Sequence, residues 1–326
     1  MSQSVSFLIV GTSRSGTTLV QRLACEVPGV RMPPETHFFL SFARELLERR
    51  SFPLQEADLR EELAAFRDKL GLPLDTESLY TELGGRCASL VELFHAIVRQ
   101  LAGEAAILGE KTPEHLWWWR WLARAIPEVR FVAVIRDPRA VTSSLRSTPW
   151  ARDRPVWRIA ERWCFDQREV RAMRRALGSD RVLVLKYENV VESSDEARDR
   201  LAEFLGVSAP SGPFGTVPVA GGSDILPRRE QWRKRALEPV TTSRRYAWKS
   251  SLTREQADLV TAICRREMAR YSYLNEVAGP WRYVRSMLSL PLRDQARRVK
   301  YRRTMKRRIM GLARIPVGPH ERARVV

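Results

Sequence analysis

The sequence predicts an α/β fold in which a doubly wound parallel sheet carries a helical cap insertion and a basic C-terminal tail. Three observations predict it. Short β-branched runs alternate with helical patterns in residues 1–280, helical patterns alone fill residues 38 to about 104, and positive charge gathers in residues 281–326. We therefore expect one α/β domain over residues 1–280, with the cap inserted at about 38–104, followed by the tail.

The individual elements follow from short apolar runs that end at turn signals. Strands are expected at residues 5–10, 105–108, 131–135 and 182–185. Helices are expected at residues 16–27, 114–125, 137–145, 155–177, 193–205 and 253–269, with helices and no strand in the cap, and a loop at 207–229. Strands that are separated by helices pair in parallel, with helices on both faces of the sheet.

Composition excludes several classes of protein. The chain has 56 Lys and Arg against 38 Asp and Glu, a net charge of +18, and 44% of its residues are hydrophobic, which rules out a wholly disordered chain. The four cysteines and four histidines are scattered, so we expect unpaired thiols and no metal site. No apolar run is long enough for a signal sequence or a membrane span. A cytoplasmic protein is expected, with membrane association through the tail as the alternative.

The turn after the first predicted strand is a candidate anion-binding loop, made of Gly11, Thr12, Ser13, Arg14, Ser15, Gly16, Thr17 and Thr18. Its glycines allow backbone N–H groups and a helix N-terminus to surround an oxyanion. The spacing is that of a P-loop, G-x-x-x-x-G-K-[ST], except that Thr17 stands where lysine is expected. Because the cation of the loop is instead Arg14, ATP or GTP hydrolysis is disfavoured. The alternative is a glycine turn that binds nothing.

A second motif completes a resemblance to a known family. Residues 135–144 read Ile-Arg-Asp-Pro-Arg-Ala-Val-Thr-Ser-Ser. The loop resembles the 5′-phosphosulfate loop of sulfotransferases that use 3′-phosphoadenosine-5′-phosphosulfate (PAPS). The second motif resembles their 3′-phosphate element, in which an arginine at a strand end and a serine eight residues later hold the ribose 3′-phosphate, as Arg136 and Ser144 would here. Such a strand end lies at the ligand-binding edge of α/β sheets.

The resemblance implies a P-loop-like fold and a transferase activity. The motif layout is most similar to that of glycan, tyrosylprotein and bacterial sulfotransferases. Such an enzyme moves a sulfuryl group from PAPS to a hydroxyl of an acceptor and releases 3′,5′-ADP, without a metal. The expected acceptor is a carbohydrate, a glycolipid or a natural product.

Catalytic roles also follow from the resemblance, since sulfuryl transfer needs a base and cations. Glu35 is placed like the catalytic glutamate of tyrosylprotein sulfotransferases, and Lys111 resembles the lysine that glycan and tyrosyl members place near the bridging oxygen. We expect Glu35 to be the general base and Lys111 and Arg14 to stabilise the transition state, although two cations would weaken a carboxylate as a base. His37 is the rival base, and packing in the cap is its alternative role.

Three further residues are candidates for nucleotide contact. Tyr187 resembles the tyrosine that contacts adenine in the family, and an ordinary core position is the equal alternative. Arg245 and Trp248 lie where family members close a loop over the nucleotide, but the Arg-Lys-Gly of cytosolic members is absent, so the closing arginine stays open. A run of tryptophans is expected to cover a core seam rather than to stack on a sugar: Trp117, Trp118, Trp119 and Trp121.

The tail alternates basic and apolar side chains over residues 293–312, the pattern of an amphipathic helix that could lie on an anionic membrane surface. A solvated basic end is the alternative, and no nucleic-acid motif is present.

Two rival functions of the protein stay open. One is a P-loop kinase that uses ATP, which needs a phosphate-binding lysine and a Mg²⁺ carboxylate. The other is a non-catalytic protein that binds polyanions or membrane surfaces. The oligomeric state is not predicted.

Overall fold

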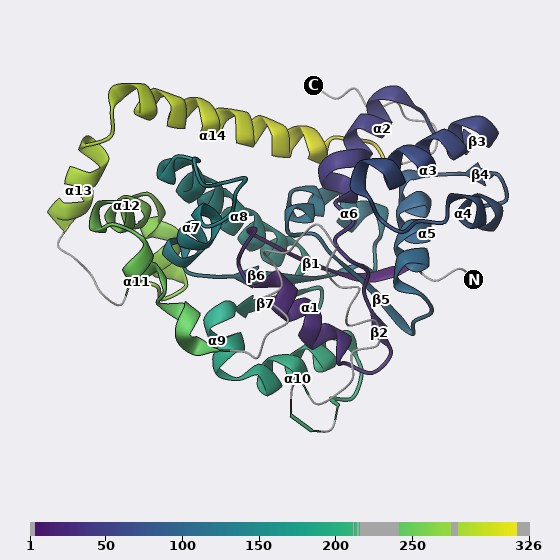
Figure 1. The fold of residues 1–326 in the computed structure, drawn as a ribbon, viewed down its shortest axis with the longest axis horizontal. Coiled ribbons are helices and arrows are strands. Elements are labelled where there is room, and N and C mark those ends of the chain that lie inside the picture. Colours follow the sequence, from purple (N-terminus) through teal and green to yellow (C-terminus); the bar gives the residue numbers. More distant parts are fainter. Residues whose placement is uncertain (1–3, 211, 214, 216–240, 275–279, 318–326) are drawn as a thin grey trace.

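The computed structural model describes residues 4–317 except 211, 214, 216–240 and 275–279. Its centre is a parallel sheet of five strands in the order β2-β5-β1-β6-β7 (Figure 1). The strands are β1 (Val5–Gly11), β2 (Val30–Arg31), β5 (Ile107–Lys111), β6 (Arg130–Ile135) and β7 (Val182–Lys186). The chain winds from the central β1 first toward one edge and then toward the other, which confirms the doubly wound α/β prediction.

Both faces of the sheet are covered, because the strands are apolar on both sides. In β1, Phe7 and Ile9 pack in the cluster that contains α1 and α10, whereas Leu8 and Val10 pack in the cluster on the cap side. The first face carries α1 (Thr17–Cys25), α9 (Tyr187–Glu192) and α10 (Ser194–Leu205). The second carries α5 (Leu90–Ala102), the 3₁₀-helix η2 (Pro113–Trp118), α6 (Trp119–Ala125) and α8 (Val156–Leu177).

Strand register brings the two predicted motifs to one edge of the sheet. Ile9 of β1 is in register with Lys111 of β5 and with Val132 of β6. The three strands therefore end side by side, and the segments that follow them meet at the carboxyl edge, where ligands bind in such sheets. α7 (Pro138–Arg146) begins at this edge. Beside it lie α11 (Trp248–Ser251) and α12 (Arg254–Arg270).

The cap contains the predicted helices and one feature that was not expected. Its elements are a π-helical turn η1 (Phe38–Phe42), α2 (Ala43–Arg49), α3 (Glu56–Leu70), α4 (Thr76–Glu82) and α5. The expectation of no strand was wrong, since β3 (Leu54–Gln55) and β4 (Arg86–Cys87) form an antiparallel pair. Two residues per strand are too few to produce a periodic pattern. Moreover, α5 packs on β1 and β5, so the end of the insertion is part of the sheet layer.

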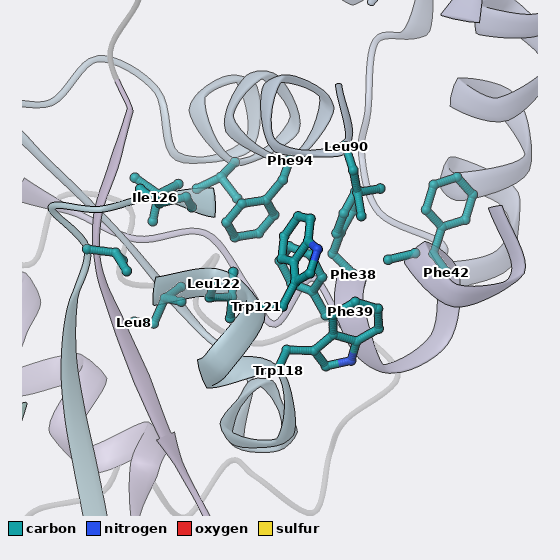
Figure 2. Close-up of a cluster of buried hydrophobic side chains, with 14 of the residues drawn as sticks. Leu8, Phe38, Phe39, Phe42, Leu90, Phe94, Trp118, Trp121, Leu122 and Ile126 are labelled. Atoms are coloured by element: carbon teal, nitrogen blue, oxygen red, sulfur yellow. The ribbon is translucent and has the colours of Figure 1, made fainter. Parts of the chain in front are cut away.

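An aromatic core joins the cap to the sheet. Figure 2 shows Phe38 and Phe39 of the cap beside Phe94 of α5 and Trp118 and Trp121 of the tryptophan-rich segment. The Phe39 ring centroid lies 4.9 Å from that of Phe94 and 5.2 Å from that of Trp118. All four tryptophans of this segment are buried in the main core cluster, which confirms their expected role in a core seam. The helix that carries them is divided into η2 and α6.

The tail forms two helices, α13 (Pro280–Leu288) and α14 (Leu292–Ala313). The long α14 crosses the molecule along α8 and reaches the cap side near α6 (Figure 1). Its apolar face is covered by the body of the protein, since Met305, Ile309 and Leu312 belong to the main core cluster. Residues 318–326 of the tail, and most of the loop expected at 207–229, lie outside the described residues. Within the described part of the chain, no helix is both long and apolar enough to cross a membrane.

Candidate active site

The candidate anion loop lies between β1 and α1, as the sequence predicts. Arg14 and Gly16 adopt left-handed backbone conformations, with φ of 72° and 95°, and the N–H of Ser15 donates to the carbonyl of Thr12 at 3.1 Å. A Cβ at Gly16 would lie 2.3 Å from a ring carbon of Tyr187. Only glycine therefore satisfies both the backbone conformation and the close approach of this ring.

The residues of the loop fit an anionic group. The Ser15 hydroxyl is buried, and among the described residues it has no hydrogen-bond partner. Gly16 is the N-cap residue of α1. Because it has no side chain, no N-cap side chain accepts a hydrogen bond from the first N–H groups of this helix. A phosphate or sulfate oxygen would satisfy both groups and would be stabilised by the positive end of the helix dipole.

The second motif lies directly beside this loop. Arg136 follows β6 and donates to the carbonyl of Arg14 at 3.2 Å, while its guanidinium lies 4.0 Å from the centroid of the Tyr187 ring. The Nε of Arg14 donates to the hydroxyl of Ser144 at 3.2 Å. Burial lowers the pKa of Arg136, and the neighbouring Tyr187 and Glu188 offset part of this effect. Arg136, Ser144 and Tyr187 thus gather around Arg14, whereas their roles toward a nucleotide stay predictions.

Glu188 holds this region in place and was missed in the sequence. Its carboxylate accepts from the N–H of Asp137 at 3.0 Å and from the hydroxyl of Tyr273 at 2.7 Å. Burial raises the pKa of Tyr273, and the adjacent Glu188 carboxylate raises it further. The only sequence signal was the position of Glu188 next to Tyr187.

The two residues expected to close over the nucleotide lie further away. The side chain of Arg245 forms an ion pair with Glu192 at the end of α9. Trp248 packs on α7, with the guanidinium of Arg139 4.1 Å from its ring centroid. It is the backbone carbonyl of Arg244 that accepts a hydrogen bond from Arg136, at 3.0 Å. The segment that carries Arg245 therefore reaches the candidate site through its backbone.

Three of the four predicted catalytic residues meet in one buried cluster. Lys111, at the end of β5, forms an ion pair with one carboxylate oxygen of Glu35 and donates to the hydroxyl of Thr18 at 3.4 Å. The Nε2 of His37 lies 3.3 Å from the other oxygen of Glu35. Glu35 is 2% exposed and Lys111 is fully buried, while His37 is 25% exposed. The fourth residue, Arg14, contacts Ser144 instead.

A buried carboxylate positions the segment that carries Glu35 and His37. One oxygen of Glu110 accepts from the hydroxyls of Thr36 at 2.9 Å and Thr112 at 2.7 Å, and the other lies 2.8 Å from Nδ1 of His115. Burial alone would raise the pKa of Glu110, but the imidazole of His115 and these hydroxyls outweigh it, so the pKa is lowered. Sequence reasoning missed Glu110, since only the fold shows what it contacts.

A cavity of about 540 Å³ opens beside the catalytic cluster. Thr12, Ser13, Glu35 and His37 line one part of it. The other part was not expected, because it is built by α14 and by α8 with the turn before it; its lining includes Arg154, Arg158, Ile159, Arg162, Tyr301, Met305 and Arg308. Trp117, which belongs to the core cluster, also lines the cavity.

Among the ranges that the structure describes, no group of three or more His, Cys, Asp or Glu is arranged to hold a metal ion. The polar groups of the site are those of an anion loop, an ion-paired carboxylate and a set of arginines. Such an arrangement can bind a phosphorylated ligand and accept a proton beside it.

Comparisons with known proteins agree with this geometry. A sequence model of the sulfotransferase family matches residues 6–211. The fold is similar to that of the sulfotransferase domain from the Synechococcus PCC 7002 olefin synthase, at 20% identity and a TM-score of 0.52, over 82% of this chain and 94% of that one. It is also similar to the sulfotransferase domain from the curacin biosynthetic pathway, at 16% identity and a TM-score of 0.55, over 84% of this chain and 99% of that one. No curated protein matches the chain significantly in sequence.

Proposed function

The chain belongs to the sulfotransferase family, and from this premise we propose that it transfers a sulfuryl group from PAPS to a hydroxyl of an acceptor, with release of 3′,5′-ADP. One observation carries the proposal. The ammonium of Lys111 contacts both the carboxylate of Glu35 and the hydroxyl of Thr18 in the anion loop. A single buried side chain thus connects a candidate base to the loop that would hold the donor. When bound there, PAPS supplies the activated sulfuryl group.

The residues around the loop fit the two charged ends of this donor. The loop and the N-terminus of α1 would hold the 5′-phosphosulfate, and Arg136 and Ser144 would hold the 3′-phosphate. Arg14 belongs to the loop and donates to Ser144, so one cation serves both phosphate elements. Tyr187, stacked beneath Arg136, is the candidate for adenine contact. Arg245 and Trp248 stay candidates for closing over the nucleotide.

Glu35 would take the proton of the acceptor hydroxyl. The cation of Lys111 favours the charged form of this carboxylate, which would accept the proton as charge builds on the hydroxyl. The same cation, with Arg14, would stabilise the negative charge that develops on the leaving phosphate. His37 contacts the second oxygen of Glu35 and would keep the carboxylate oriented toward the cavity.

The acceptor is expected to bind in the cavity beside Glu35. Its volume of about 540 Å³ lies within the range of small-molecule and sugar-sized sites. Aromatic side chains of Trp117 and Tyr301 line it. These features support a carbohydrate, glycolipid or natural-product acceptor whose reacting group is small enough to enter the cavity.

The test compares Glu35→Gln with His37→Gln. The two variants and the wild type are incubated with ³⁵S-labelled PAPS and a panel of hydroxylated sugars and phenols, and transfer is followed together with the release of 3′,5′-ADP. We expect Glu35→Gln to lower kcat by about 10²- to 10⁴-fold, the usual contribution of a general base, while 3′,5′-ADP still binds. For His37→Gln we expect a loss of about tenfold. The reverse order of effects would assign the base to His37, and phosphate transfer from ATP to the same acceptors would contradict the proposal.

A further inference from the structure

We propose that the acceptor cavity contains an anion subsite formed by Arg154, Arg158 and Arg308, so that the acceptor carries a phosphate, sulfate or carboxylate group in addition to the hydroxyl that is sulfated. This inference rests on the proposed function, since it concerns the second substrate of that reaction. It adds a substrate class that neither the family match nor the similar structures specify.

The three arginines come from two distant parts of the chain, residues 154–158 and α14, and line one cavity with Glu35. Arg154 precedes α8, Arg158 lies in its first turns, and Arg308 lies in α14, which runs along α8 (Figure 1). Two contacts fix α14 in this position. Its Arg298 donates to Glu161 of α8 at 2.6 Å, and the Met305 side chain is buried. The tail therefore forms a wall of the cavity.

The charges of the cavity are not balanced by the protein. The fourth lining arginine, Arg162, is 3.4 Å from Glu114 and 3.0 Å from Asp166, and the lining carboxylate of Glu35 is paired with Lys111. Both acidic side chains of the lining are thus already used by other cations. A bound anion would therefore meet no unpaired carboxylate in the cavity that repels it.

Arg154, Arg158 and Arg308 form no ion pair with any carboxylate of the described chain. Burial lowers the pKa of Arg154, and the neighbouring cations Arg158 and Arg162 lower it further. Burial lowers the pKa of Arg308 as well, and Arg162 again adds to the effect. Gathering like charges at a partly desolvated surface is unfavourable, and a bound anion reverses that cost.

Each of the three guanidinium groups is held against an aromatic ring. The distances to the ring centroids are 4.9 Å for Arg154 over Trp150, 5.4 Å for Arg158 over Tyr301 and 4.8 Å for Arg308 over Trp117. Stacking occupies the face of a guanidinium and leaves its edge N–H groups for an oxyanion. The cluster is thus preorganised for a tetrahedral or planar anion.

The site proposed for the 3′-phosphate of the donor does not include these arginines. Arg14, Arg136 and Ser144 are absent from the lining of the cavity, and of the anion loop only Thr12 and Ser13 line it, together with Glu35 and His37. The anion subsite therefore lies on the acceptor side of the candidate base.

The experiment uses the full chain saturated with 3′,5′-ADP, which occupies the anion loop, and titrates it calorimetrically with phenyl phosphate and with neutral benzyl alcohol. We expect phenyl phosphate to bind at least about tenfold more tightly than benzyl alcohol. We expect Arg154→Gln, Arg158→Gln and Arg308→Gln each to weaken phenyl phosphate by about tenfold, the range for a charge-assisted hydrogen bond, without changing the affinity for 3′,5′-ADP. Arg152 and Arg307 are exposed, as the three arginines are, but lie outside the lining, and their Gln variants are the matched controls.

Equal affinity for the two probes, equal losses in the control variants, or displacement of 3′,5′-ADP by phenyl phosphate would overturn the subsite. Thermal melting of each variant shows whether it is folded. The titration with 3′,5′-ADP alone tests the donor separately. If 3′,5′-ADP does not bind, the proposed function fails. In that case, phenyl phosphate binding that still depends on the three arginines would support an anion site that does not belong to a sulfotransferase.

Discussion

Lys111 lies at the carboxyl end of β5, fully buried, beside the loop in which Thr17 replaces the lysine of ordinary P-loops. Because Lys111 is in register with Ile9, its side chain emerges next to the segment that follows β1 and reaches Thr18. The loop therefore receives a second cation, besides its own Arg14, from the neighbouring strand. Lys111 also pairs with Glu35, whereas a lysine within the P-loop itself would not.

A substitution of Gly16 tests whether the anion loop is the nucleotide-binding site. We predict that Gly16→Ala lowers the affinity for 3′,5′-ADP by at least about tenfold, because a methyl group at a φ of 95° would collide with the ring of Tyr187 and displace it. The backbone strain should also cost about 1–3 kcal/mol of stability. Calorimetry and urea unfolding measure the two effects.

Gly84→Ala is the matched control for this variant. Gly84 also has a positive φ, of 63°, but its added methyl group would meet nothing within 4 Å. It should lose stability and keep its affinity for 3′,5′-ADP. Nucleotide affinity that is equal in both variants would contradict the assignment of the loop.

The local motif brought two of the candidate residues together. The resemblance to sulfotransferases paired Arg136 with Ser144 in one strand-to-helix segment, and in the structure both contact Arg14, while their roles stay predictions. The role of Glu110 was not predictable, since its contact with Thr36 joins two distant segments of the chain. The ion pair of Arg245 with Glu192 likewise depends on how the segment before α11 packs on α9.

At the scale of elements, α14 shows what an amphipathic pattern leaves open. The sequence indicated a helix with one apolar face but not what covers that face. In the structure Met305, Ile309 and Leu312 are buried against the body, and Arg298 and Arg302 both pair with Glu161 of α8. Membrane contact through the tail stays a prediction, and it would have to use surfaces other than these side chains.

We predict that Met305→Ala and Ile309→Ala each lower the free energy of unfolding by about 2–5 kcal/mol, because each leaves a cavity between α14 and the core. Met310→Ala is the control, since Met310 is 45% exposed and should change stability by less than about 0.5 kcal/mol. Guanidinium chloride unfolding provides the comparison. Equal, small effects in all three variants would mean that α14 is not docked in solution.

At the scale of the whole molecule, the alternation of apolar strands and helices was enough to predict the parallel sheet. The missed strands, β2 and the β3–β4 pair, have two residues each and no periodicity to detect. The cavity could not be predicted at all. Three of its four arginines stand in helices that look ordinarily solvated in sequence, and only the packing of α14 along α8 brings Arg308 to the same cavity as Arg158.

Global stability should depend on pH through His95. Burial lowers the pKa of His95 from 6.5 to about 4, and the neighbouring Arg99 adds to the effect. The unfolded chain therefore binds the proton more readily between pH 6.5 and 4, so stability should fall as the pH is lowered through this window. The full loss is about 3 kcal/mol, which urea unfolding at several pH values measures, and His95→Gln should remove it. An unchanged pH dependence in the variant would contradict this role of His95.

Calorimetric titration with 3′,5′-ADP beside ADP and ATP, with and without Mg²⁺, measures whether the loop and Arg136 form a PAPS-type donor site. We predict a clear preference for 3′,5′-ADP that needs no metal and that is lost by at least about tenfold in Arg136→Ala. Arg136 is buried, so Ser144→Ala provides a milder variant in which the same preference should weaken. An affinity for ATP that equals the affinity for 3′,5′-ADP, or ATP binding that depends on Mg²⁺, would contradict a PAPS-type donor site.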